Sequence, residues 1–184
     1  MCCSRIRKGD ILLENIVLSN GKIITFRMSR WEDYAILNNL LFSCFGNMQK
    51  YGALDDLENR YLLAFDGDKV VAMTGLKRKS GFNGCEIELT CVHPEYRKNG
   101  IAVRMIAEVI RDVKTDIYIL CYRMSDKTDI GLKYAMNLLG FKCLTMGYKR
   151  YESICSDRCN ECIYRREDCT CGEDLYVRKQ TYRV

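Results

Sequence analysis

The sequence has one proline, one histidine and one tryptophan among its 184 residues, and it has no long apolar run. No segment approaches the roughly 18 apolar residues of a membrane-spanning helix. The N-terminal stretch MCCSRIRKGD carries no apolar run of the length found in signal peptides. We therefore expect a soluble, cytoplasmic protein with no membrane partner. We assign no catalytic role to His93, which precedes Pro94 in a predicted turn.

A strong excess of one charge is also missing. There are 29 basic and 24 acidic residues, which give a net charge of +5, and the basic residues are scattered along the chain. Proteins that follow the phosphates of nucleic acids usually concentrate positive charge on one face. This distribution argues against a nucleic-acid partner and favours a small anionic molecule.

The size of the chain suits one domain with a sizeable core, because 48% of its residues are hydrophobic. We interpret residues 1–20 as a leader. Residues 21–184 would form a single domain, with a cysteine-rich insertion at about 153–173 before the last strand.

Hydrophobic periodicity predicts a mixed α/β (α+β) domain. Three β-rich runs in 61–79 and 84–92 indicate an antiparallel meander, and a helix before the run at 116–122 indicates a parallel crossover. Further strands are expected at 22–28, 142–151 and 174–184. Helices are expected from a Ser29–Glu32 capping box to Phe45, at 53–60, from Gly100 to Val113, and at 129–139 before Gly140.

The stretch VHPEYRKNGIAVRM, residues 92–105, joins a strand to an amphipathic helix. The N-terminus of a helix has free backbone N–H groups and a positive dipole end, which together bind phosphate oxygens. Gly100 lets the backbone approach a ligand closely, and Arg97 and Lys98 add positive charge. The stretch therefore indicates a cradle for a pyrophosphate, although it matches neither a P-loop nor the three-glycine dinucleotide motif.

The run Arg97-Lys98-Asn99-Gly100-Ile101-Ala102 matches the Arg/Gln-x-x-Gly-x-Gly/Ala signature of the GNAT superfamily of acyl-CoA N-acyltransferases, which the sequence resembles from about 22 to 152. The run NLLGFKCL at 137–144 is similar to that family's late helix ending in Gly-Phe. The resemblance implies a mostly antiparallel central sheet with helices on both faces. It also implies that acetyl-CoA binds at 97–102, with backbone N–H groups near Cys91 and Val92 bonding the thioester carbonyl or the pantetheine arm.

The strand that precedes the cradle carries two carboxylates. Strict alternation would place Glu86, Glu88 and Thr90 on one face and Cys85, Ile87, Leu89 and Cys91 on the other. Carboxylates two residues apart on a strand are about 6 to 7 Å from each other, and such a pair suits a general base. In the family that this sequence resembles, a glutamate at the position of Glu86 often removes the proton of the amine, with Glu88 as the alternative here. A solvated strand face is the other interpretation.

The family's late helix often carries a tyrosine that protonates the leaving thiolate, four residues before the glycine of Gly-Phe. That position is Met136 in this sequence, and Tyr134 falls on the opposite face of the helix. Tyr122 is a candidate substitute as the general acid. Core packing or simple exposure are the alternatives for Tyr122.

Five cysteines lie within 17 residues, a density that could surround one tetrahedral ion. We predict a structural zinc site here, and redox-labile thiols or disulfides and an iron–sulfur cluster stay as alternatives. Other cysteines, Cys91 among them, fall in apolar runs and are expected to be packed thiols. The cluster consists of Cys155, Cys159, Cys162, Cys169 and Cys171.

Two functional hypotheses follow. The first is an N-acetyltransferase that moves an acetyl group from acetyl-CoA directly to a primary amine, with a glutamate as general base. The second is a catalytically weak or inactive CoA-binding module whose cysteine-rich loop binds metal, senses redox state or docks a protein partner. The sequence leaves open whether the acceptor is a small molecule or a protein, and whether the chain forms a homodimer.

Overall fold

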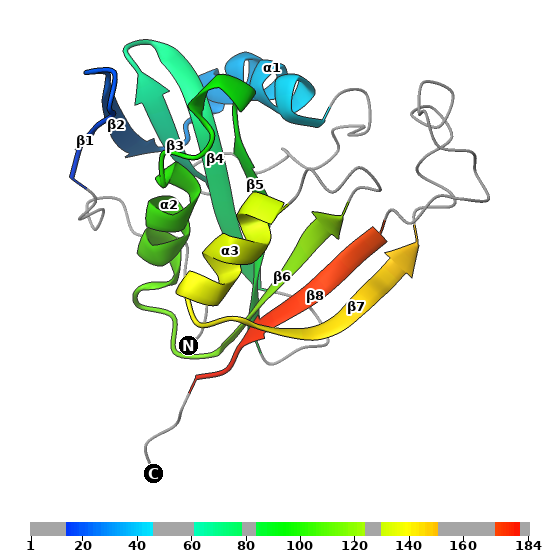
Figure 1. Cartoon of the computed structure of the whole chain (residues 1–184). Helices are drawn as coiled ribbons and strands as arrows, with labels where there is room; N and C mark the ends of the chain where they lie inside the picture. Colours follow the sequence, from blue (N-terminus) through cyan, green and yellow to red (C-terminus); the bar gives the residue numbers. More distant parts are fainter. Residues whose placement is uncertain (1–13, 46–60, 79–83, 124–129, 151–171, 181–184) are drawn as a thin grey trace.

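A computed structural model describes residues 14–45, 61–78, 84–123, 130–150 and 172–180 (Figure 1). In this part of the chain one sheet of eight strands carries helices on both faces. The strands are β1 (Ile16–Val17), β2 (Ile23–Met28), β3 (Tyr61–Asp66), β4 (Lys69–Arg78), β5 (Gly84–Val92), β6 (Asp116–Arg123), β7 (Lys142–Arg150) and β8 (Gly172–Arg178). The helices are η1 (Trp31–Asp33), α1 (Tyr34–Phe45), η4 (Pro94–Tyr96), α2 (Ile101–Ile110) and α3 (Ile130–Leu138).

The strand order is β1-β2-β3-β4-β5-β6-β8-β7. Neighbouring strands from β1 to β5 are antiparallel, which confirms the predicted meander. The pair β5 and β6 is parallel and is joined through α2, which confirms the predicted crossover. Strand β8 then lies between β6 and β7 and is antiparallel to both. The mixed, mostly antiparallel sheet expected from the sequence is therefore the observed one.

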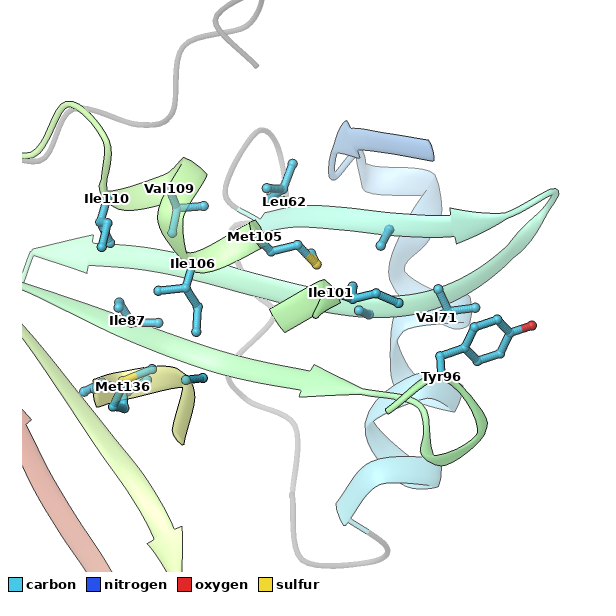
Figure 2. Close-up of a cluster of buried hydrophobic side chains, with 14 of the residues drawn as sticks. Leu62, Val71, Ile87, Tyr96, Ile101, Met105, Ile106, Val109, Ile110 and Met136 are labelled. Carbon is cyan, nitrogen blue, oxygen red and sulfur yellow. The ribbon is translucent and has the colours of Figure 1, made fainter. Parts of the chain in front are cut away.

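Two hydrophobic clusters cover the two faces of the sheet. Figure 2 shows the first, in which Ile106 of α2 lies by Ile87 of β5 and Met105 of α2 lies towards Leu62 of β3; Met136 of α3 belongs to the same cluster. The amphipathic repeat after Gly100 produces this contact, because it places apolar side chains on one side of α2. The second cluster packs α1 against the other face of β3, β4 and β5, through residues that include Leu37, Leu40, Leu41, Leu63 and Met73.

The predicted Ser29–Glu32 capping box is wrong. The Ser29 hydroxyl accepts a hydrogen bond from the Tyr61 backbone N–H at 3.0 Å, so it joins β3 to the end of β2. The N-cap is Arg30, whose N–H donates to the Asp33 carboxylate at 2.7 Å. Arg27 also donates two hydrogen bonds to this buried carboxylate, at 2.7 and 2.6 Å. The start of α1 is thus fixed by a charged pair that sequence spacing does not reveal.

The helix predicted at 129–139 is α3, and it ends as expected. Gly140 has a φ of +77°, and the Phe141 N–H donates to the Met136 carbonyl at 2.9 Å, a Schellman-type end. The short helix predicted at 53–60 lies outside the described residues. Among the helices that are described, none is long and apolar enough to cross a membrane.

Candidate active site

The sheet opens at the centre of the molecule, where β5 and β6 separate. Their parallel register runs from Gly84 with Asp116 to Ile87 with Ile119. Beyond these pairs, residues 88–92 of β5 have no partner on β6 in the described part of the chain, and the two strands diverge in Figure 1. The register with β6 thus ends before the last residues of β5, and buried backbone groups that lack a strand partner need another one.

A β-bulge lies on β5 next to this opening. Met73 pairs with Cys91 and Gly75 pairs with Glu88, so two residues of β5 oppose Thr74. One of them, Leu89, has a φ of +47°, which is rare for a residue with a branched side chain. The other, Thr90, shares a 2.7 Å hydrogen bond between hydroxyl groups with Thr74. Such strained backbone is often found at functional sites.

The bulge changes which residues share a face, and it overturns part of the predicted alternation. Ile87 packs in the cluster below α2, as expected from its face of the strand. Leu89 and Cys91 instead pack in the cluster below α1, opposite to Ile87. Strict alternation fails because the extra residue at the bulge shifts the pattern by one. Cys91 is 7% exposed, which agrees with the expectation of a packed thiol.

The two carboxylates precede the bulge and lie at the point where β5 leaves β6. Glu86 is half-buried and pairs in register with Lys77 on β4 and Tyr118 on β6. The Glu88 side chain is 10% exposed, and its Oε2 lies 2.6 Å from the Lys77 Nζ. Lys77 therefore neutralises part of the negative charge of this face.

Tyr61 of β3 also holds Glu88. The Tyr61 hydroxyl donates to Glu88 Oε1 at 3.4 Å, and its ring is fully buried. The ring lies directly over Gly75, where an added Cβ would come within 2.5 Å of the Tyr61 Cδ1. A glycine at position 75 is thus what allows the tyrosine to reach the carboxylate.

We expect Gly75→Ala to lower the free energy of unfolding by about 1–3 kcal/mol, because the new methyl group overpacks the Tyr61 ring. Chemical denaturation measures the change. In a Tyr61→Leu background the same substitution should cost much less, because the ring that it meets is gone. Equal costs in the two backgrounds would show that the ring contact does not explain the need for glycine.

The cradle predicted at 97–102 has the expected backbone. Lys98 and Gly100 have φ values of +64° and +73°, and α2 begins at Ile101. The first backbone bond into the helix runs from the Arg104 N–H to the Gly100 carbonyl at 3.1 Å. In the described part of the chain, the N–H groups of 98–103 have no backbone acceptor. A Cβ built at Gly100 meets nothing within 4 Å, so the space in front of the helix is open.

Side chains close the turn from behind. The Asn99 amide donates to the carbonyls of Tyr96 and Arg97 at 3.2 and 3.1 Å, and Arg97 Nε donates to the Val92 carbonyl at 3.1 Å. These bonds occupy carbonyl oxygens, whose negative dipole ends would repel a phosphate. The N–H groups without a backbone acceptor and the occupied carbonyl oxygens both fit a bound pyrophosphate.

The turn is anchored by Tyr96, a residue to which sequence reasoning assigned no role. Its ring is buried in the α2 cluster, and Figure 2 shows its hydroxyl pointing away from that cluster. The hydroxyl donates to Asp66 at 2.6 Å and accepts from Lys22 Nζ at 2.9 Å, and Lys22 also pairs with Asp66 at 2.6 Å. The hydrogen bonds with Lys22 and Tyr96 lower the pKa of Asp66. Lys22, which precedes β2, and Asp66, at the end of β3, thus hold the turn that leads into the cradle.

The remaining predicted residues are placed as follows. Met136 is fully buried in the core, whereas Tyr134 is 65% exposed, which confirms that they lie on opposite faces of α3. Tyr122 belongs to β6, but its side chain lies outside the described part of the structure. The cysteine cluster, at 155–171, also lies outside it. Within the described residues, no group of three or more metal-ligating side chains comes together.

Comparison with known families identifies the class of this protein. The sequence model of the acetyltransferase (GNAT) family matches residues 26–141, more than half of the chain. This span contains the carboxylate strand, the bulge and the cradle. The chain therefore belongs to the GNAT family of acetyltransferases, and it is an acyl-CoA N-acyltransferase. Acetyl-CoA and an amine acceptor are the substrates typical of this family. No curated protein sequence matches the chain.

Solved structures agree on the fold. A GNAT-family acetyltransferase from Bacillus cereus ATCC 10987 superposes with a TM-score of 0.61 at 12% identity, over 85% of this chain and 97% of that one. Diaminobutyrate acetyltransferase from Paenibacillus lautus, in complex with L-2,4-diaminobutyric acid and coenzyme A, gives 0.61 at 13% identity, over 85% and 95%. The ribosomal-protein-S18-alanine N-acetyltransferase of Escherichia coli gives 0.55 at 12% identity, over 85% and 93%.

Proposed function

We propose that the protein transfers the acetyl group of acetyl-CoA directly to a primary amine, with Glu86 as the general base. The observation that carries this proposal is the opening between β5 and β6, which lies between the carboxylates and the cradle. A donor whose pyrophosphate sits on the free N–H groups of 98–103 can extend along β5 where it has left the register with β6. Its thioester would then reach the bulge, which follows the two carboxylates on the same strand.

Acetyl transfer requires three steps at this site. The amine must lose a proton before its lone pair can attack the thioester carbonyl, and a carboxylate at the opening can accept that proton. Negative charge then develops on the carbonyl oxygen, and a backbone N–H near Cys91 or Val92 can stabilise it. The thiolate of CoA finally leaves, and we keep Tyr122 as the candidate acid that protonates it.

We prefer Glu86 to Glu88 as the general base because of the contacts that Glu88 makes. The Glu88 carboxylate is nearly buried and is held by Lys77 at 2.6 Å and by Tyr61. A carboxylate fixed in this way is less free to accept a proton from a substrate. Glu86 stands where the family's glutamate base is expected, so we assign it the base and assign Glu88 the task of positioning Lys77 and Tyr61.

The test is to incubate the protein with acetyl-CoA and a set of amines, which comprises a polyamine, an aminoglycoside, free amino acids and peptides with a free N-terminus or a lysine. Acetylated products should be measured by mass spectrometry, because the 12 cysteines of the chain would disturb an assay of released thiol. Turnover of any amine supports the proposal and names the acceptor class. Tight CoA binding with no turnover would favour the alternative of a weakly active CoA-binding module. The buried Met136, at the position where the family often has a tyrosine, supports this alternative.

The cysteine cluster at 155–171 gives a separate prediction. Protein purified anaerobically without chelator should contain about one zinc ion per chain by elemental analysis, because four thiolates complete a structural zinc site. Cys159→Ser should lower the zinc content, whereas Cys143→Ser, at an exposed free thiol on β7, should not. Iron with acid-labile sulfide would instead indicate an iron–sulfur cluster, and metal-free protein would rule out both.

A further inference from the structure

Two hydroxyl groups meet at the bulge of β5, and the proposed reaction does not use them. They belong to the threonine pair, Thr74 of β4 and Thr90 of β5, whose hydroxyls are 2.7 Å apart. Thr74 is fully buried and Thr90 is half-buried. In the described part of the chain, this is the side-chain hydrogen bond that both threonines make, and neither makes another. The pair therefore joins the two strands at the bulge itself.

The bulge is a conformation that its own residues do not favour. Leu89 has a φ of +47°, and Gly usually takes the first position of a bulge with such a φ, because a Cβ crowds the left-handed conformation. A strained residue of this kind persists only where its surroundings fix it.

Contacts on both faces of the sheet fix the bulge. The Leu89 side chain packs in the cluster below α1. Thr74 pairs in register with Leu62, which belongs to the cluster below α2, so the threonine pair lies on the opposite face. Leu89 is thus packed on one face, while the next residue along β5 is tied to β4 on the other.

The register after the bulge decides which backbone groups of β5 face the opening. The His93 N–H donates to the Val71 carbonyl at 2.8 Å. Hydrogen-bonded pairs alternate along an antiparallel ladder, so Met73 and Cys91 form the next such pair, and the Cys91 N–H is directed at β4. Val92 lies between these two pairs, so its N–H and its carbonyl are directed away from β4.

The Arg97 side chain agrees with this direction. Its Nε donates to the Val92 carbonyl at 3.1 Å, as expected for a carbonyl that does not bond to β4. The side away from β4 is the one on which residues 84–87 pair with β6. Of Cys91 and Val92, the two residues considered as donors to the thioester, Val92 is therefore the one whose N–H is directed to the opening.

We propose that Thr74 and Thr90 are positioning residues for acetyl transfer: their hydrogen bond fixes the bulge and so keeps the Val92 N–H directed at the thioester carbonyl. This role rests on the proposed function, because it takes effect only when acetyl-CoA lies at the opening. A fixed donor acts mainly on the transition state, since it meets the negative charge that develops on the carbonyl oxygen. Loss of the pair should thus lower kcat and leave CoA binding at the cradle nearly unchanged.

Thr90→Val removes one hydroxyl and keeps the size of the side chain. We expect kcat to fall by about 10- to 100-fold, while the Kd for CoA, measured by calorimetry, changes by about twofold or less. Thr90→Ser keeps the hydroxyl and should bring kcat back to within about threefold of the wild type. Thr115→Val is the matched control, because it removes a buried hydroxyl that lies 3.5 Å from Cys85 Sγ, near the other end of β5, and it should keep kcat.

The double variant Thr74→Val/Thr90→Val separates positioning from stability. Thr90→Val alone leaves the buried Thr74 hydroxyl without its partner, which lowers the melting temperature, whereas replacing both hydroxyls by methyl groups removes that cost. We expect the double variant to regain most of its melting temperature and to keep the low kcat of Thr90→Val. A double variant that regains kcat together with its stability would overturn the assignment.

Amide hydrogen exchange, followed by NMR, tests the threonine pair without enzymatic activity. The Cys91 amide, which pairs with Met73, should exchange at least about tenfold faster in the double variant than in the wild type. The Tyr176 amide, on β8 between β6 and β7, should not change. Unchanged exchange at Cys91 would overturn the role of the pair. Absence of turnover by the wild type with every amine would overturn the proposed function, and the exchange rates would still decide whether the threonine pair holds the bulge.

Discussion

Glu86→Gln is expected to lower kcat for acetyl transfer by about 10²- to 10⁴-fold, the usual contribution of a general base. Glutamine keeps the size of the side chain but cannot take the proton of the amine. The affinity for acetyl-CoA, measured by calorimetry, should stay unchanged because the donor binds through the cradle.

Glu88→Gln is the matched control. It removes the 2.6 Å ion pair with Lys77 and should lower thermal stability, with a loss in kcat of about tenfold or less. The reverse pattern, in which Glu88→Gln causes the larger loss in kcat and Glu86→Gln loses about tenfold or less, would move the base to Glu88. Full activity in both variants would contradict a glutamate base on β5.

Gly100→Asn should weaken CoA binding by about tenfold or more, which corresponds to about 1.4 kcal/mol of binding free energy. Asparagine tolerates the left-handed conformation that Gly100 adopts at a φ of +73°, and no atom lies within 4 Å of the new Cβ, so folding should be preserved. Its side chain would occupy the space where a phosphate approaches the backbone. Isothermal calorimetry with CoA gives the affinity.

Gly67→Asn provides the control for conformation, because Gly67 has a φ of +57° in the hairpin between β3 and β4, with open space around it. It should leave CoA affinity unchanged. If Gly100→Asn binds CoA as tightly as the wild type, the prediction that a phosphate approaches the backbone closely at residue 100 is wrong, even though the helix begins where expected.

The fold and the cradle could be predicted from the sequence because their signals are local. Pro94, Gly100 and the apolar repeat of α2 lie close together in the sequence, and each determines the conformation of the backbone next to it. The faces of β5 could not be predicted in full, because the bulge at Leu89 arises from the register with β4 and leaves no mark in the strand itself. Ser29 failed as a cap for a similar reason, since Tyr61 takes its hydroxyl from a distant strand.

Residues that support the candidate site were missed for the same physical reason. Tyr61 reaches Glu88 only because β3 and β5 are both neighbours of β4. A glycine in a strand, such as Gly75, is a signal of close approach that could have been used. It does not say which side chain approaches.

The junction between β5 and β6, which has four register pairs, is a seam between two parts of the sheet that come from different parts of the chain. Strands β1 to β5 come from the first 92 residues, and β6, β7 and β8 come from residues 116 to 178. The carboxylates, the bulge and the cradle all fall between residues 84 and 104, on one side of this seam. The residues proposed to hold the acyl donor therefore come from one continuous stretch of the chain, whereas the candidate acid, Tyr122, comes from the other side of this seam.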